Sequence, residues 1–412
     1  MTYIYLFIPF ALVTGSFLSD LSISILGLYF IFISFKEKLW DYYKNYFTYI
    51  FVFFYFVLIA SSLKSQYFVE SISVSLFYFR YLFFVLATVY LVNNNKIFLR
   101  YFFISLLVAI FVVTFDGYLQ YITGTNSLGW QFDERLSGLF ADNKVIGTYL
   151  ARLLPIMFGL YLLNKNINQK IYILLLALIV LVEILIFLSG ERSAFFLVSL
   201  STLTILILLK NNKQLRLIAF LIVSLSVVLI TNFIPDTKYR MFDQTISEFQ
   251  GKDYSYNTRS YEEKNIYIFS KNHDDYLRTS LNMFQSQPIL GHGPRTFRIM
   301  CNDELYSKNQ NCSTHPHNIY LELLGEVGMA GTLPLLIGLI IILYFFLKQF
   351  FILLYNRSKE FITDFDVCML AAIFINIFPF IPTLSFYNNW SSIMLYLPIG
   401  LILSKKLKVT ST

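Results

Sequence analysis

Long apolar runs, separated by short polar turns, alternate along the chain up to about residue 232 and again from residue 331. Each run approaches the ~20 apolar residues that an α-helix needs to cross a lipid core of about 30 Å. Helices are expected because, in lipid, each backbone polar group must find its partner within the protein. The pattern predicts twelve spans, at residues 3–18, 20–35, 46–63, 71–93, 98–115, 141–163, 170–188, 193–210, 215–232, 331–354, 364–382 and 389–404.

The segment between the two apolar regions is polar and contains helical patterns of its own. Leu277, Leu281 and Phe284 recur at helical spacing and predict a helix over residues 274–287. A second amphipathic helix is predicted over residues 318–326, leading into the tenth span. The chain is therefore predicted to be an all-α polytopic integral membrane protein, with about 12 transmembrane helices and one large, partly helical periplasmic loop.

This pattern divides the chain into three parts. Residues 1–232 are predicted to form an N-terminal membrane bundle of about nine spans. Residues 233–330 form the large loop, which carries the candidate active-site residues. Residues 331–412 form a C-terminal membrane bundle of about three spans.

The composition and the placement of charge agree with a membrane protein. Hydrophobic residues make up 57% of the chain and charged residues 14%, against about 25% charged residues in soluble domains. The net charge of +7 comes largely from Lys and Arg in alternate short turns, which orient helices by the positive-inside rule and do not indicate nucleic-acid binding. Both termini are then cytoplasmic, and the large loop is periplasmic in the inner membrane of a two-membrane bacterium.

All four histidines, His273, His292, His315 and His317, lie in the large loop. His317 comes first as a candidate, because it directly precedes the helical run that re-enters the membrane, where a lipid-linked substrate presents its reacting end. An imidazole with a pKa near neutrality is suited to take a proton from a sugar hydroxyl. The alternative is a histidine that only caps or hydrogen-bonds the loop.

Two of the three cysteines, Cys301 and Cys312, lie in the same loop. Together with His315 and His317 they would offer four ligands of types that zinc accepts. Their spacing fits no zinc signature, and an oxidising compartment favours a disulfide between the two cysteines. We therefore expect the disulfide and no metal.

Two arginines near or within the apolar runs are candidates for binding an anion. Arg192 lies in an outward turn, SGERS, and its planar guanidinium can bind two phosphate oxygens at once; alternatively it is an interfacial anchor, and Glu191 could neutralise it. Arg80 lies inside a span, where a charge is expensive and usually functional. Its alternative is a structural ion pair with Glu183 or Asp116.

Further basic residues accompany the polar segments. In the outward loop at 133–155, Arg135, Lys144 and Arg152 could hold an anion, with Asp142 orienting one of them. In the large loop, Arg278, Arg295 and Arg298 lie near the histidines and suggest a pyrophosphate or another polyanionic substrate. Taken singly, each is more often a solvated surface charge.

Four segments in order carry a family resemblance: RLSGLFADNKVIGTYL, SGERSAFF, PILGHGPRTFR and CSTHPHNIYLELLGEVGMAG, over residues 133–335. With them the chain resembles the O-antigen ligase and O-antigen polymerase superfamily of bacterial inner membranes. The resemblance implies an inverting, metal-independent glycosyltransferase that moves a glycan from undecaprenyl diphosphate to an acceptor hydroxyl. It also implies that His317 and Arg192 are catalytic. A further loop arginine is expected to contact the diphosphate, with Arg278 preferred over Arg295.

Several activities remain open within and beyond this resemblance. A ligase passes the glycan to lipid A core, a polymerase extends a lipid-linked glycan, and a protein O-oligosaccharyltransferase uses a protein hydroxyl. A polysaccharide transporter or flippase is the alternative from another class. The chain has no nucleotide-binding motif, so we expect no cofactor, and the donor itself supplies the energy. The predicted substrate-binding residues are Arg278, Arg295, Arg80, Arg135, Asp142 and His315, and membrane lipids are expected partners.

Overall fold

A computed structural model describes residues 1–163, 169–211, 213–250, 267, 269–307, 311–356 and 359–407. The regular secondary structure of the described chain is helical, apart from one isolated bridge between Thr125 and Gln131. Loops connect the helices. The helices are α1 (Thr2–Ala11), α2 (Ser16–Lys36), η1 (Trp40–Tyr43), α3 (Tyr46–Lys64), α4 (Phe68–Ser75), α5 (Arg80–Asn94), α6 (Phe98–Thr123), η2 (Gly138–Phe140), α7 (Ile146–Leu162), α8 (Gln169–Leu188), α9 (Arg192–Leu208), α10 (Lys213–Phe233), α11 (Pro235–Lys238), η3 (Tyr239–Asp243), α12 (Gln244–Phe249), α13 (Lys271–Ser286), α14 (Phe297–Met300), α15 (Ile319–Tyr355), α16 (Asp364–Asn376) and α17 (Asn389–Lys406).

Seven helical segments of the described chain are long and apolar enough to cross a membrane, namely residues 16–36, 46–64, 68–94, 98–123, 169–188, 213–233 and 319–355. Each overlaps a predicted span. The other five predicted spans coincide with helices that are shorter or less apolar: α1, α7, α9, α16 and α17. The regular structure of the described chain is thus all-helical, with seven segments able to cross a membrane, and the number of twelve spans stays a prediction.

Two predicted spans are interrupted. The span predicted at 3–18 ends as α1 at Ala11, and α2 begins after Gly15, whose φ of +110° suits glycine and stops the helix. The span predicted at 71–93 is divided between α4 and α5, with Leu76 to Phe79 in a turn between them. Hydropathy reports the apolar length of a run but not a local change of backbone direction, which explains both differences.

The core of the bundle is built around α7. Its residues from Ile146 to Leu160 are buried, and the helix packs against α6, α8, α9 and α16. Gly159 lets α16 approach closely, since a Cβ there would lie 2.9 Å from the Cβ of Cys368. A second group of contacts joins α5 to α2 and α17. The site described below lies against the end of α16 and the loop after it.

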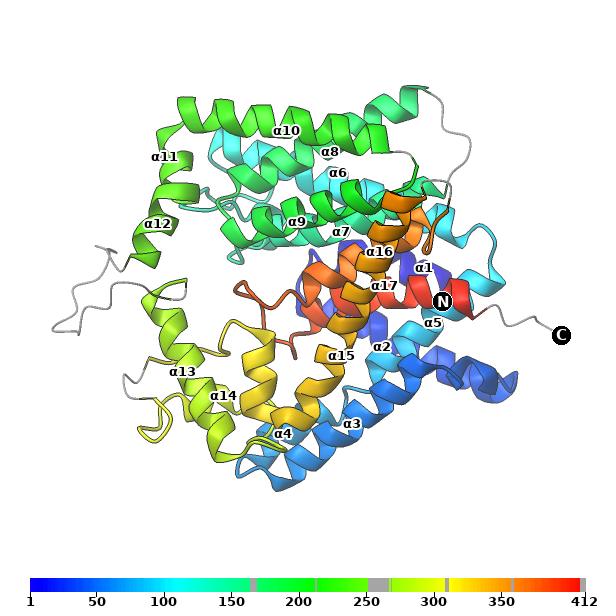
Figure 1. Ribbon diagram of the computed structural model, residues 1–412, viewed down its shortest axis with the longest axis vertical. Helices are drawn as coiled ribbons and strands as arrows, with labels where there is room; N and C mark the ends of the chain where they lie inside the picture. Colours follow the sequence, from blue (N-terminus) through cyan, green and yellow to red (C-terminus); the bar gives the residue numbers. More distant parts are fainter. Residues whose placement is uncertain are drawn as a thin grey trace.

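The polar helices gather on one side of the bundle. In Figure 1, α11 to α14 lie at the left, whereas the N-terminus and the end of α17 lie toward the right. The predicted helix at 274–287 is confirmed as α13, which begins at an N-cap, Ser270, whose hydroxyl accepts from the backbone N–H of His273. Residues 251–266 of the predicted large loop lie outside the described residues.

A kink in α15 places the polar loop on the bundle. Gly328 has φ +64° and interrupts the helix, which frees backbone groups on both sides of it. The turn at 288–293 satisfies them: Gly293 N–H donates to the carbonyl of Glu326 at 2.7 Å, and Met329 N–H donates to the carbonyl of Pro288 at 2.8 Å. The predicted passage from a helix at 318–326 through Gly328 into the tenth span is confirmed, with the kink as its joint.

Candidate active site

Asn318 joins the histidine-rich loop to the start of α15. Its side-chain oxygen accepts hydrogen bonds from the backbone N–H groups of Tyr320 at 3.0 Å and Leu321 at 3.2 Å. Its side-chain nitrogen donates to the carbonyl of Pro379 at 2.7 Å. Asparagine is a strong N-cap because its side chain satisfies amides that the first helical turn leaves unpaired. Asn318 thus fixes where α15 begins relative to the loop at 377–388.

His317 is held in an uncommon backbone conformation. Its φ is +55°, a left-handed conformation that costs a non-glycine residue about 1 kcal/mol or more. Its carbonyl accepts a hydrogen bond from the backbone N–H of Thr383 at 2.7 Å. A segment far away in the sequence therefore supports the conformation that aims this imidazole.

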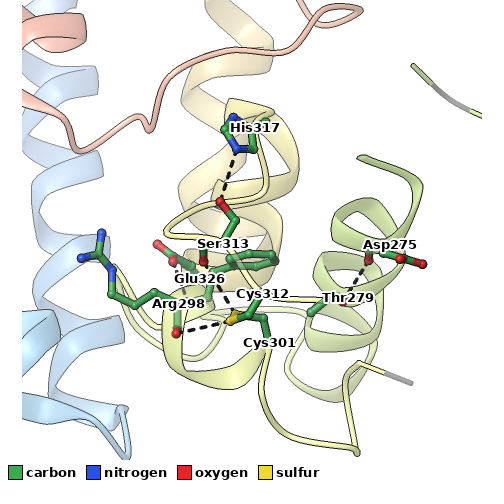
Figure 2. Close-up of a disulfide and its surroundings, with 9 residues drawn as sticks. Asp275, Thr279, Arg298, Cys301, Cys312, Ser313, His317 and Glu326 are labelled. Atoms are coloured by element: carbon green, nitrogen blue, oxygen red, sulfur yellow. Dashed lines mark hydrogen bonds between the residues drawn. A yellow bond between two sulfur atoms is a disulfide. The ribbon is translucent and has the colours of Figure 1, made fainter. Parts of the chain in front are cut away.

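The imidazole of His317 has one polar contact within the described chain. Its Nε2 lies 3.3 Å from Ser313 Oγ, and Figure 2 shows Ser313 between this ring and the disulfide. Among the described residues, Nδ1 of His317 has no hydrogen-bond partner. One ring nitrogen is thus oriented by a hydroxyl, and the other remains available to a ligand.

Three aromatic rings pack around His317. The ring centroids lie 4.1 Å away for His315, 5.5 Å for His273 and 5.7 Å for Tyr276. Burial lowers the pKa of the His317 imidazole below its usual range. Burial, together with the charge of His317, lowers the pKa of His315 and of His273 to about 4. All three imidazoles are therefore neutral at pH 7.

His315 differs from His317 because both of its ring nitrogens are engaged. Nε2 lies 3.2 Å from the carbonyl of Thr383, and Nδ1 lies 3.0 Å from Thr314 Oγ1. Since a carbonyl only accepts, Nε2 of His315 carries the hydrogen and Nδ1 accepts from the threonine hydroxyl. His315 thus positions the loop on Thr383, and its ring faces that of His317.

The two loop cysteines are joined in the structure. Cys301 and Cys312 form a disulfide, with their Cα atoms 5.1 Å apart (Figure 2). Cys301 is fully buried among Tyr276, Met283 and Phe297. The bond closes the segment that leads to Ser313 and His317. It also removes the two thiolates on which a zinc site in this loop would depend.

Arg192 begins α9, and its partner is not the adjacent Glu191. Its Nη1 lies 2.8 Å from Glu248 Oε2, and its Nη2 donates to Glu248 Oε1 at 3.0 Å. Glu191 turns back to α7, where it accepts from the backbone N–H groups of Gly147 at 2.6 Å and Thr148 at 3.1 Å. The expected neutralisation by Glu191 is therefore wrong. His273, His315 and His317 are called the histidine cluster below. The charge of Arg192 acts on this cluster, because it contributes to lowering the pKa of His273.

The three arginines of the large loop have different surroundings. Arg278 is mostly exposed and its Nε donates to Asp274 Oδ2 at 2.9 Å. Arg295 is half-buried, with its backbone N–H bound to Glu326 Oε2 at 2.7 Å. Arg298 is exposed, and its charge acts on His315 and on the buried Glu326. Among the three loop arginines, Arg298 is thus the one whose charge acts on a histidine of the site, although its guanidinium points away from His317 (Figure 2).

Arg80 belongs to another part of the bundle. Its Nη2 lies 3.0 Å from Asp20 Oδ1 and donates to Asn389 Oδ1 at 2.5 Å. The predicted partners have other roles: Glu183 pairs with Arg216 at 2.6 Å, and Asp116 accepts from the backbone N–H of Ser127 at 3.0 Å. The expectation that Glu183 or Asp116 pairs with Arg80 is therefore wrong, because hydropathy does not report which helices are neighbours.

The first outward loop contains ion pairs that the sequence did not predict. Arg135 Nη2 donates to the carbonyl of Lys144 and lies 3.9 Å from Glu191 Oε2. Lys144 pairs with Asp133 at 2.6 Å. Asp142 is exposed, and within the described chain it contacts none of the basic residues that it was expected to orient. The arginine that does turn inward from this region is Arg152, on α7.

Two residues that hold the loop segments of the site, Thr383 and Glu326, were not anticipated from the sequence. Thr383 binds the backbone of His317 and the ring of His315. Glu326, buried on α15, accepts from the backbone N–H groups of Arg295 at 2.7 Å and Phe297 at 2.9 Å. A carboxylate four residues after Glu322, just before an apolar run, is a signal that could have identified Glu326. No local pattern marks Thr383.

Comparison with known proteins gives one match and one absence. Residues 173–336 match the family model described as O-antigen ligase. The matched region runs from α8 into α15 and includes Arg192, all four histidines and both disulfide cysteines. Among curated proteins, none matches the chain.

Proposed function

We propose that this chain, which belongs over residues 173–336 to the O-antigen ligase family, transfers a glycan from undecaprenyl diphosphate to an acceptor hydroxyl. The family indicates a glycosyltransferase of the ligase or polymerase type. We infer the ligase reaction, with lipid A core as the acceptor, at the periplasmic face of the inner membrane. Both termini are then cytoplasmic.

The observation that carries the proposal is the environment of His317. A sugar hydroxyl is barely ionised at neutral pH, so transfer needs a base that is itself unprotonated. His317 meets this need because burial lowers the pKa of its imidazole and its Nδ1 has no partner among the described residues. A positioned base typically accelerates such a step by roughly 10²–10⁴.

The reaction follows from this arrangement. The acceptor oxygen attacks the anomeric carbon from the face opposite the diphosphate, and its proton passes to His317. The bond between the anomeric carbon and the phosphate oxygen breaks, and the electron pair leaves with the diphosphate, so the configuration inverts. Arg192, with a planar guanidinium, is assigned to the developing phosphate charge. Among the loop arginines we assign a similar role to Arg298, because its charge acts on His315.

A polymerase would use the same site with a lipid-linked glycan as the acceptor, and a protein O-oligosaccharyltransferase would use a protein hydroxyl. A transporter or flippase would need substrate passage between the two faces of the membrane. The histidines favour transfer over passage, because His273, His315 and His317 belong to the polar segment that precedes α15 and not to the interior of a long apolar helix.

The test is glycan transfer by the purified protein in detergent, with lipid-linked glycan and lipid A core supplied and no ion gradient present. Arg192→Lys keeps the charge but loses the two-point geometry, so it should reduce transfer, whereas Lys36→Ala, at an exposed position, should not. A deletion strain that loses all glycan on lipid A core supports the ligase reaction. Retention of one repeat unit would support the polymerase instead, and no transfer in vitro would contradict both.

A further inference from the structure

A small cavity lies directly behind the histidine loop. It has a volume of about 20 Å³, and its polar lining comes from Arg152 on α7, Asn376 on α16, and Thr383, Ser391 and Ser392 of the loop and helix that follow. The rest of its lining is apolar: Ile319, Leu384, Phe386 and Leu395. A water molecule needs roughly 10–15 Å³ of such space. The cavity therefore admits one small polar group, such as a single oxyanion oxygen, and is too small for a sugar ring.

Arg152 brings a charge into this cavity. Its side chain is buried, with 4% of its surface exposed. Its Nε donates to Asn376 Oδ1 at 2.8 Å, and its guanidinium lies 5.8 Å from the ring centroid of Trp390. Its Nη1 has no hydrogen-bond partner, and no carboxylate of the described chain lies within ion-pair distance of it.

The closest source of negative charge, Glu191, is already shared. Glu191 acts on Arg152 electrostatically, but its oxygens accept hydrogen bonds from Gly147 and Thr148, and it forms an ion pair with Arg135 at 3.9 Å. The single negative charge of Glu191 is thus shared between Arg135 and Arg152, so one positive charge is not compensated. An arginine stays charged when it is buried, and a buried charge is costly without a partner. A bound anion would therefore stabilise the buried charge of Arg152.

Thr383 links the unpartnered charge to the histidines. Its hydroxyl oxygen is buried, lines the same cavity and, among the described residues, has no hydrogen-bond partner. Its backbone N–H binds the carbonyl of His317, and its carbonyl binds the ring of His315. Two residues with unpartnered donors, the guanidinium of Arg152 and the hydroxyl of Thr383, therefore line one cavity, and the backbone of Thr383 contacts the candidate base.

We propose that Arg152 and Thr383 bind one phosphate oxygen of the diphosphate leaving group. This inference rests on the proposed function, and it assigns to the leaving group a binding site on α7 and the loop at 377–388. As the bond to the anomeric carbon breaks and its electron pair moves to the phosphate, the Arg152 guanidinium stabilises the added charge. Thr383 then ties this phosphate site to the position of His317.

The two side chains allow an unusual test, because neither has a complete set of partners in the ligand-free protein. Thr383→Val removes a buried hydroxyl that has no partner among the described residues, so its ligand-free melting temperature should stay the same or rise. Arg152→Met removes a buried charge without a carboxylate partner but also loses the hydrogen bond to Asn376, so it should lower the melting temperature less than loss of an ion-paired arginine does. Arg216 provides a matched control. It is equally buried, but it is paired with Glu183 at 2.6 Å, so Arg216→Met should lower the melting temperature.

Binding is measured on the full-length protein in detergent by titration calorimetry, with inorganic pyrophosphate, undecaprenyl diphosphate and sodium chloride at matched ionic strength. Loss of a charged hydrogen bond should weaken both diphosphate ligands about tenfold or more in Arg152→Met. Thr383→Val should weaken them several-fold, by about 1 kcal/mol, and the folded fraction of Arg216→Met should bind normally. Normal diphosphate affinity in both Arg152→Met and Thr383→Val would overturn the proposal.

The source of the anion and the proposed function are tested separately. If chloride alone binds in an Arg152-dependent manner and the diphosphates do not, the site holds a free inorganic anion and the proposal fails. If diphosphate binding depends on Arg152 but no glycan is transferred in vitro, the binding site stands and the proposed function fails. Normal transfer kinetics in Arg152→Met, with normal Kd for undecaprenyl diphosphate, would leave the proposed function standing and remove Arg152 from it.

Discussion

Glu248 occupies both terminal nitrogens of Arg192, with its oxygens 2.8 Å from Nη1 and 3.0 Å from Nη2. This two-point geometry is the one that a phosphate group would adopt on the same guanidinium. Thr245 adds an oxygen at 3.1 Å from Nη1. Glu248 thus stands where the proposed donor would bind, and the donor must displace it.

Glu248→Gln should therefore improve donor binding without removing activity. The neutral amide competes less well for the guanidinium, so the KM for the lipid-linked donor should fall about threefold, corresponding to the modest strength of a partly exposed ion pair. Steady-state transfer kinetics measure this change, with Glu37→Gln at an exposed position as the control. If Glu248→Gln lowers the transfer rate as much as Arg192→Ala does, Glu248 itself is required for transfer. The idea that Glu248 competes with the donor for Arg192 is then wrong.

The disulfide should contribute to stability more than to chemistry. The two cysteines are 11 positions apart, and closing a loop of this length lowers the free energy of the folded state by about 3 kcal/mol relative to the unfolded chain. Replacing both Cys301 and Cys312 with Ala should lower the melting temperature while leaving transfer measurable at low temperature. Cys368→Ala, at the free buried cysteine, controls for loss of a sulfur. An unchanged melting temperature in the double variant would contradict this prediction.

Gly291, in the turn that packs against the kink of α15, should tolerate no side chain at its position. Gly291 has φ +61°, and a Cβ there would lie 2.4 Å from the backbone carbon of Glu326. Gly291→Ala should therefore detach the turn and reduce the yield of folded protein. Gly338→Ala is the control, because nothing lies within 4 Å of its Cβ position and alanine favours a helix. Equal yields and melting temperatures for the two variants would show that the turn is not wedged against α15.

Acid should destabilise the protein through its buried histidines. The pKa of His273 is lowered to about 4 by burial and by the charge of His317, whereas an unfolded histidine titrates near 6.5. Between these values the unfolded chain binds a proton that the folded protein does not, so the unfolding free energy falls as the pH drops from about 6.5 toward 4. The loss of melting temperature over this range should be smaller in His273→Gln. Parallel pH profiles for the variant and the wild type would contradict the lowered pKa.

Local sequence predicted much of the fold and the general place of the site. Periodic apolar residues predicted α13, and the glycines and polar residues around 318–331 predicted a helix that continues into a span. These features depend on residues close together in the chain. The histidines and the disulfide cysteines lie in one polar segment, so the composition of that segment alone indicated where to look, although Arg192, Arg152 and Thr383 lie outside it.

The partners of the charged residues were not predictable in the same way. Arg80 pairs with Asp20 across two helices, and Arg192 pairs with Glu248 from the polar helices. Which carboxylate meets which arginine depends on how the helices pack, and hydropathy contains no information about that. For the same reason Thr383 escaped notice, since its role comes from a loop that reaches His317 only in the folded protein.

The central claim is that His317 is the general base, and it is tested by replacing His317 with Asn. Asparagine tolerates the left-handed backbone of this position better than alanine does, so folding should be preserved. His292→Gln is the control, because His292 binds Ser286 Oγ at 2.7 Å in another part of the loop.

The decisive measurement is the rate of glycan transfer by the purified protein, with donor and acceptor saturating and with or without EDTA. We predict a loss of roughly 10²–10⁴ in His317→Asn, an unchanged melting temperature, and no effect of EDTA. A normal rate in His317→Asn, or abolition of wild-type transfer by EDTA, would contradict the account.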